Sequence, residues 1–193
     1  MIDKRAFAKL KAELERFDAA REEVIRTSRD VLKASKAAIY AVHRNDKKVA
    51  KEHLDEAKKA LALINSRITQ DPKIVTVGAI HEGVEEYVEA CCYFGIMFDK
   101  KLPLPKELNV DLEPYLCGLC DTVGELVRKA INSAVDDDTK TAMEMRQIVR
   151  ELFEELNTFE LRNTPARKKF DSIKYGLEKL EDLALQLKLK GKL

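Results

Sequence analysis

Four acidic residues are spaced so that they could form a metal site. Glu86 and Glu89 stand three residues apart in EEYVEACCYF, and Asp121 and Glu125 stand four apart in CDTVGELVRKAIN. On a helix, each of these pairs shares one face. Carboxylates that gather without a local cation are typical ligands of Mg²⁺, with Mn²⁺ as an alternative. We therefore predict that two facing helices build a four-carboxylate Mg²⁺ site.

The same acids also have a purely structural explanation, which the sequence leaves open. Glu125 is followed one turn later by Arg128 and Lys129, and the other acids could pair with basic residues of other helices. We assign Glu82 and Glu85 to this structural group. A di-iron centre is less favoured, because it characteristically uses Glu-x-x-His and none of the three histidines follows a glutamate at that spacing.

A second pattern predicts binding to a polyanion. Residues 26–48 hold seven Lys or Arg against Asp30 and Asp46, in a chain whose formal net charge is only +1. Most of these cations recur every three or four residues, which places them on one acid-free helical stripe. We expect the stripe, with a basic block at 167–174 as a second wall, to hold the phosphate backbone of RNA. The predicted RNA-binding residues are Arg26, Arg29, Lys33, Lys36, Tyr40, His43, Arg44, Arg167 and Lys168.

The composition predicts helices to position these residues. The 193 residues include seven Gly and five Pro, and Ala, Leu, Lys and Glu dominate. We expect an all-α fold, a single-domain bundle over 1–193 of six or seven mostly antiparallel helices. The expected helices span 3–44, 48–69, 73–98, 113–133, 138–158 and 165–189. In the first of them, Val24, Val31 and Ala38 repeat every seven residues and predict a buried seam.

The same features indicate an intracellular protein without a membrane segment. No window approaches 18 uninterrupted apolar residues, and the N-terminus lacks the apolar core of a secretory signal. The four cysteines lie in apolar helical sequence, which favours reduced, buried thiols over a disulfide framework or a zinc site. We therefore expect a soluble, cytoplasmic location.

Four segments, in order, resemble the translin superfamily. They are REEVIRTSRDVLKASKAAIYAVHR (21–44), GVEEYVEACCYF (83–94), YLCGLCDTVGELVRKAINSA (115–134) and RKKFDSIKYGLEKLEDLALQLKLKG (167–191). The sequence is more similar to the translin-associated factor X (Trax-like) branch than to translin itself. The resemblance implies a seven-helix fold that assembles into a hollow, octamer-like oligomer with RNA in a basic interior.

In the factor X branch, the resemblance also implies a Mg²⁺-dependent endoribonuclease. The acids of that branch sit in E-Y-V-E and D-x-x-G-E motifs, which fall here on Glu86 and Glu89 and on Asp121 and Glu125. Single-stranded RNA or a short duplex is the expected substrate, and single-stranded DNA is a further expected ligand. The alternative is a non-catalytic, translin-like protein that binds RNA or single-stranded DNA, in which the acids only pair with Lys or Arg across helices.

Overall fold

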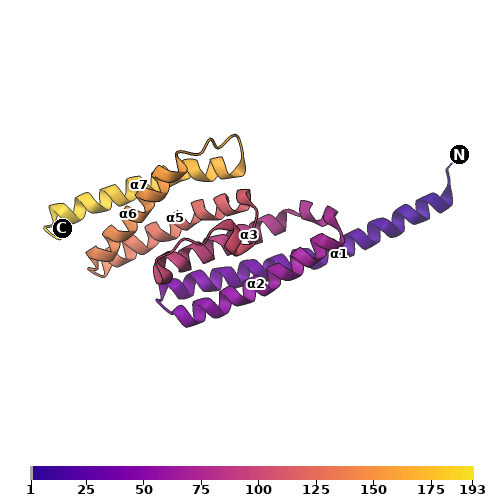
Figure 1. Ribbon diagram of the computed structural model, residues 1–193, viewed down its shortest axis with the longest axis horizontal. Helices are drawn as coiled ribbons and strands as arrows, with labels where there is room; N and C mark the ends of the chain where they lie inside the picture. The colour runs from indigo at the N-terminus through magenta and orange to yellow at the C-terminus, as the bar shows by residue number, and fades with distance from the viewer. Residues whose placement is uncertain (1) are drawn as a thin grey trace.

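Helices make up all of the regular structure in the computed structural model, which describes residues 2–193 (Figure 1). The α-helices are α1 (Lys4–His43), α2 (Lys47–Gln70), α3 (Gly78–Phe94), α4 (Pro105–Leu108), α5 (Leu112–Val135), α6 (Thr139–Leu156) and α7 (Pro165–Leu189). A 3-10 helix, η1 (Pro72–Thr76), precedes α3, and a π-helix, η2 (Gly95–Asp99), follows it. The predicted all-α fold is confirmed. Among the described helices, none is both long and apolar enough to cross a membrane.

Short polar side chains set where the helices begin. The Asp3 carboxylate accepts hydrogen bonds from the backbone N–H groups of the first turn of α1, and Asp46 accepts one from Val49 N at the start of α2. Thr164 caps α7, whose first residue is Pro165, a position where the missing N–H has no cost. Five of the six predicted helices therefore have bounds within two residues of those observed.

The predicted helix 73–98 is wrong as a single element. Val77 has an extended backbone, with φ −75° and ψ 109°, which separates η1 from α3. At the other end, Gly95 lies against the chain that returns from η2, and a Cβ there would stand 2.4 Å from the Lys101 carbonyl oxygen. The backbone therefore widens into a π turn after Phe94 and stops at Lys100, which is left-handed.

The helix α3 is central, because it packs on one side against α1 and on the other against α5 (Figure 1). The helix α5 in turn packs against α6 and α7. The predicted seam of α1 is confirmed, since Val24, Val31 and Ala38 are all buried. The uncharged run after Glu89 is buried as well, from Ala90 to Ile96, so α3 enters the core directly after its carboxylates.

Two glycines bring α3 close to its neighbours. A Cβ on Gly118 of α5 would lie 2.4 Å from the Glu85 carbonyl oxygen and 2.7 Å from Val88 Cβ. A Cβ on Gly83 of α3 would lie 3.2 Å from the Ser28 carbonyl oxygen of α1. The α3–α5 contact is therefore possible only because position 118 has no side chain, and it carries both pairs of candidate acids.

Candidate functional site

The structure brings the four predicted acids together on the facing sides of α3 and α5. Glu86 and Glu89 come from α3, and Asp121 and Glu125 come from α5. All four are partly buried, and the two residues of α5 lie close enough to Glu89 to raise its pKa. We call these four residues the carboxylate cluster.

Glu89 is the least compensated member of the carboxylate cluster. Burial, followed by the charges of Glu86, Asp121 and Glu125, raises the pKa of Glu89 to about 8. Burial also raises the pKa of Glu86, although Lys36 on the basic stripe acts in the opposite direction. Near neutral pH the cluster therefore holds a proton that an ordinary glutamate would have released, which a bound cation could replace.

Asp121 has a cation from a third helix as its partner. Lys169 of α7 donates a hydrogen bond to Asp121 Oδ2 and another, 2.7 Å long, to Glu85 Oε2. Burial raises the pKa of Asp121 in spite of this bond, because the group is largely withdrawn from water. Glu85 is thus explained as a structural ion pair, as its assignment predicts, while Lys169 is a site residue that the sequence analysis missed.

Glu125 is held by a histidine from another helix. His43 Nε2 of α1 contacts Glu125 Oε2, and the other ring nitrogen, Nδ1, lies 3.1 Å from the Tyr93 hydroxyl of α3. Arg128 stands farther off, with its Nη1 3.7 Å from Glu125 Oε2. The side chain of His43 is only 11% exposed. Its predicted place on the exposed basic stripe therefore differs from the structure, in which the ring belongs to the carboxylate cluster.

A signal for the inward position of Lys169 and His43 lies in the phase of their helices. Lys169 comes three residues after Ala166 and four before Ile173, which are both buried, so it sits at the edge of the inward face of α7. His43 follows the buried Ile39 by four residues in the same way. A charged or polar side chain at such a position must find a partner inside the protein.

The donor set of the carboxylate cluster suits a hard divalent cation, since it consists of carboxylate oxygens from two adjoining helices. Within residues 2–193, however, no group of three or more His, Cys, Asp or Glu side chains is arranged to hold a metal ion. Lys169 and His43 each engage one member of the cluster. The residue types therefore fit Mg²⁺, and binding would require the contact of Lys169 with Asp121 to loosen.

The basic stripe reaches the carboxylate cluster along α1. Arg26, Arg29, Lys33, Lys36 and Arg44 are exposed, and within residues 2–193 none of them forms an ion pair with an acid. Burial raises the pKa of Glu86, and Lys36 is close enough to oppose part of that rise. Tyr40 is 51% exposed, and the Arg128 guanidinium carbon lies 5.6 Å from its ring centre. A polyanion along the stripe would thus pass beside the acids.

The second predicted basic wall is less free. Arg167 Nε lies 3.0 Å from Asp171 Oδ1, and its guanidinium also stacks on Phe170. Lys168 is exposed. The adjacent Lys169 points inward to Asp121. Of the three residues in the RKK run, Arg167 and Lys168 therefore lie at the surface and Lys169 contacts the carboxylate cluster.

Comparison with known proteins assigns the chain to a family. A sequence model of the Translin family matches residues 19–191. The chain belongs to the translin family. Mouse translin-associated protein X is 25% identical over 229 aligned residues, which cover 96% of this chain and 78% of the mouse protein. Translin from Gallus gallus is 30% identical over 83 residues, 43% of this chain and 36% of that protein. The resemblance to the translin-associated branch is therefore confirmed.

A protein of Methanocaldococcus jannaschii is 31% identical over 145 residues, which cover 74% of this chain and 64% of that protein. The chain thus spans less than two thirds of the length of this relative. Among solved structures, the crystal structure of apo-NeC3PO superimposes with a TM-score of 0.87 at 26% identity, over 96% of this chain and 98% of that one. AfC3PO in complex with duplex RNA has a TM-score of 0.82 at 24% identity, over 96% and 97% of the two chains. These matches confirm the translin-like fold.

Proposed function

We propose that this protein is a Mg²⁺-dependent endoribonuclease, with Mn²⁺ as an alternative ion. The observation that carries the proposal is Glu89, a partly buried acid among three other acids, whose pKa is raised to about 8. Such a group is costly to keep in a fold, and activity is a reason to keep it. The exposed cations of α1 that lead to it supply a path for RNA.

Glu86, Glu89, Asp121 and Glu125 would hold the ion. A bound Mg²⁺ supplies Lewis-acid chemistry, which polarises a phosphodiester and makes water acidic enough to attack it near neutral pH. Arg26, Arg29 and Lys33 would bind the RNA backbone, and Lys36 would keep phosphate close to Glu86. The exposed ring of Tyr40 can stack on a base. Sequence preference should be weak, because contacts to phosphate carry no base information.

The fold relatives support RNA as the partner, since AfC3PO holds duplex RNA. Single-stranded RNA, short duplexes and single-stranded DNA are the ligands that we propose, in a self-associated, hollow and octamer-like particle. We propose the cytoplasm as the location, which suits four cysteines that are all free and buried.

A second candidate function is translin-like binding of RNA or single-stranded DNA without cleavage. A specific observation favours it, because Asp121 and Glu125 already have partners in Lys169 and His43. In that case the carboxylate cluster would be a set of ion pairs that join α1, α3, α5 and α7. The two functions differ in whether Mg²⁺ and Glu89 matter.

The experiment that separates them is cleavage of end-labelled RNA, single-stranded and duplex, with binding followed on the same samples. Wild type, Glu89→Ala and Glu82→Ala are compared in Mg²⁺ and in EDTA at fixed ionic strength. Glu82 is an exposed glutamate of the same helix and serves as the control. We expect cleavage, leaving 5′-phosphate and 3′-hydroxyl ends, only with Mg²⁺ and an intact Glu89, while all three proteins bind. Binding without cleavage under every condition would favour the second function.

A further inference from the structure

The first four turns of α1 project beyond the rest of the molecule. Every residue from Ile2 to Arg16 is exposed, and Figure 1 shows this end of the helix running out beyond the other helices. The part from Lys4 to Arg16 is about 20 Å long at a rise of about 1.5 Å per residue. An isolated helix of this length is marginal in water, because most helical stability in proteins comes from packing of an apolar face.

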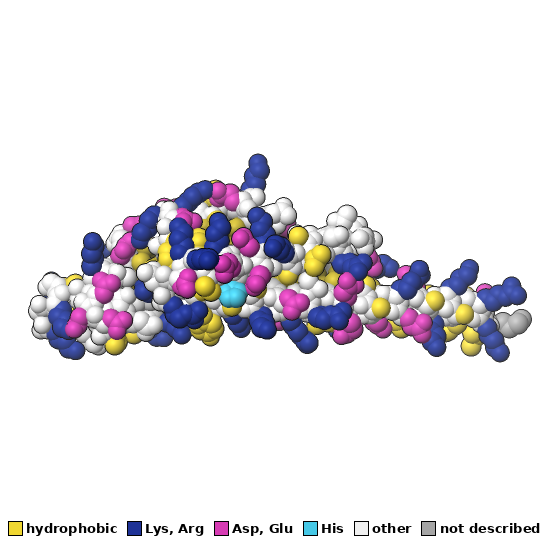
Figure 2. Space-filling view, turned by 90° about the horizontal axis from the view of Figure 1, so that it is seen from below, with side chains coloured by type: hydrophobic (Ala, Val, Ile, Leu, Met, Phe, Trp, Pro, Cys, Tyr) yellow, Lys and Arg dark blue, Asp and Glu magenta, His cyan; other side chains and the backbone are white. Residues whose placement is uncertain are grey.

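This projecting part carries an apolar stripe that nothing in the described chain covers. Phe7, Leu10 and Leu14 are 61%, 60% and 59% exposed. Their spacing of three and four places them on one face, and Phe17 continues it. Figure 2 shows hydrophobic side chains at the surface of the same narrow extension. A series of exposed large apolar residues at helical spacing is typical of an interaction surface.

The stripe is the continuation of the buried seam of α1. Leu10 and Phe17 precede Val24, Val31 and Ala38 at the same interval of seven residues. From Val24 onward this seam is buried in the core, but α2 ends at Gln70 and the chain turns back through η1. The seam therefore extends past the end of its own partners.

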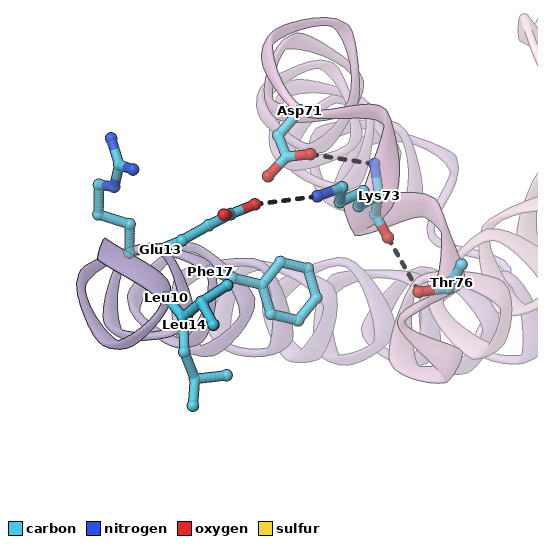
Figure 3. Close-up of a pocket in the computed structure, with 8 residues that line it drawn as sticks. Leu10, Glu13, Leu14, Phe17, Asp71, Lys73 and Thr76 are labelled. Carbon is cyan, nitrogen blue, oxygen red and sulfur yellow. Dashed lines mark hydrogen bonds and ion pairs between the residues drawn. The ribbon is translucent and has the colours of Figure 1, made fainter. Parts of the chain in front are cut away.

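Figure 3 shows how the covered and uncovered parts of the seam meet. Phe17 points toward η1, and Leu10, Leu14 and Phe17 all line an open hollow between α1 and η1. Lys73 of η1 reaches across, with its Nζ 3.3 Å from Glu13 Oε1. This single ion pair ties the base of the projecting helix to η1 and leaves its apolar side chains open.

The charges beside the stripe are divided along the helix. Its first turns carry Lys4, Arg5, Lys9 and Lys11, and the acid there is the capping Asp3. The following turns carry Glu13, Glu15, Asp18, Glu22 and Glu23 against Arg16 and Arg21. A parallel copy of this segment would place like charges together, and an antiparallel copy would place the basic end on the acidic end. The segment is therefore complementary to itself in one orientation.

We propose that the N-terminal segment of α1, residues 4–17, pairs antiparallel with the same segment of a second copy of this chain. Phe7, Leu10, Leu14 and Phe17 of the two copies form the apolar contact, and the basic and acidic halves flank it with opposite charge. Such a two-fold contact is closed, because each copy offers the same surface. This inference deepens the self-association proposed above by assigning it a surface and a direction.

The first test is the mass of the full-length protein in sedimentation, without RNA or Mg²⁺. The double variant Leu10→Glu, Leu14→Glu is compared with wild type and with Leu63→Glu. Leu63 of α2 is 64% exposed and lies off the stripe, so it is a matched control. We expect the double variant to weaken the association by about 100-fold or more, since four leucines lose their burial in each pair. Helix content measured by circular dichroism should fall by no more than the projecting turns of α1 contribute, because the packed helices stay folded.

The second test gives the direction of pairing. A carbodiimide joins Lys and Asp or Glu only in direct contact, and Lys4 and Asp18 of one helix stand about 21 Å apart. A peptide in which Lys4 is joined to Asp18 therefore comes from two antiparallel copies, and we expect to find it in wild type and not in the double variant.

Different failures have different meanings. A wild type that stays monomeric, or an association that Leu10→Glu, Leu14→Glu leaves unchanged, would overturn this pairing, and so would the lack of any Lys4–Asp18 link. Neither result depends on cleavage, so the proposed nuclease activity stands or falls separately. A double variant that no longer associates but still cleaves RNA in Mg²⁺ would support the pairing and show that each copy has its own site.

Discussion

Lys169 of α7 forms an ion pair with Asp121 of α5, which places an ammonium group inside a cluster of carboxylates. Burial lowers the pKa of Lys169, but its bonds to Asp121 and Glu85 outweigh this effect, so the net pKa is raised and the group stays charged. The cluster is thus partly neutralised by the protein's own cation. A divalent cation that binds the same acids has to compete with this ammonium.

Removing the ammonium should therefore destabilise the metal-free protein and favour metal binding. We expect Lys169→Met to lower the free energy of unfolding by about 1 to 3 kcal/mol, because Asp121 loses its partner in a partly buried place. Added Mg²⁺ should restore more stability to Lys169→Met than to wild type. Thermal unfolding with and without Mg²⁺ measures both effects.

Lys168→Met is the control for this prediction, since Lys168 is exposed and forms no ion pair with an acid within residues 2–193. It should unfold like wild type and respond to Mg²⁺ like wild type. An equal response to Mg²⁺ in all three proteins would argue that the ion does not bind near Asp121.

His43 should act on cleavage through Glu125. The ring is held between Glu125 and the Tyr93 hydroxyl, so it fixes the direction of a predicted metal ligand. In His43→Phe the ring contact with Tyr93 can persist while the bond to Glu125 is lost. Loss of such an outer contact typically costs about 10- to 100-fold in metal affinity or activity. We expect that loss in cleavage at limiting Mg²⁺, partial recovery at high Mg²⁺, and unchanged RNA binding.

The matched control for His43 is His53→Phe. His53 of α2 also pairs with a glutamate, Glu56, at 2.9 Å, but outside the carboxylate cluster. The His53→Phe variant should cleave RNA at the wild-type rate. If His43→Phe weakened RNA binding and left cleavage of bound RNA intact, the histidine would be an RNA contact, as its place in the basic stripe predicts.

Glu89 predicts how stability changes with pH. Its pKa is about 8 in the fold against an ordinary value of 4.5. Between these values the folded state keeps a proton that the unfolded state has released, so stability is highest below the lower pKa and falls as pH rises toward the upper one. The metal-free protein should therefore lose about 1 to 3 kcal/mol between about pH 5 and pH 8 through this group.

Denaturant unfolding at several pH values checks this expectation. Glu89→Gln cannot ionise, so its stability should vary less over the same interval. Mg²⁺ should oppose the loss in wild type and do so more strongly at higher pH, because binding displaces the proton. A wild type whose stability rises from pH 5 to pH 8 would contradict the raised pKa.

The basic stripe should give RNA affinity a steep dependence on salt. Lys33→Gln removes one exposed cation, so it should weaken binding about equally for unrelated sequences and lower the slope of log affinity against log salt by about 1 or slightly less. Lys59→Gln, an exposed lysine of α2 away from the stripe, is the control. Equal losses in the two variants would mean that the RNA path does not follow α1.

The sequence was informative wherever a feature is local. Caps such as Asp46 and breakers such as Pro165 mark helix ends within a few residues, and the intervals between the four acids show that each pair shares a face. The partners of the acids could not be predicted in this way. Adjacent residues of a helix point about 100° apart, so the roll of α7 about its own axis decides whether Lys168 or Lys169 faces Asp121. That roll is set by packing between distant segments.

The division of the predicted helix 73–98 has a similar cause. Its apolar pattern continues through Val77 and Gly95, but the backbone becomes extended at Val77, and at Gly95 the returning chain at Lys101 lies against it. Likewise, the sequence shows Gly118 only as a residue of low helix propensity. Its structural role, which is to allow close packing, depends on the backbone of α3 that lies against it.

Gly118 therefore gives the sharpest test of the architecture that gathers the acids. In Gly118→Ala the new Cβ would meet the Glu85 carbonyl oxygen at 2.4 Å, and backbone cannot move aside cheaply, so α3 and α5 must separate. We expect a loss of about 1 to 3 kcal/mol or more in the free energy of unfolding, together with weaker cleavage at limiting Mg²⁺. Gly124→Ala lies in the same helix with no atom within 4 Å of the new Cβ, and should stabilise the protein by up to about 1 kcal/mol. Equal stability of the two variants would mean that α3 and α5 are not in the close contact that brings Glu86 and Glu89 to Asp121 and Glu125.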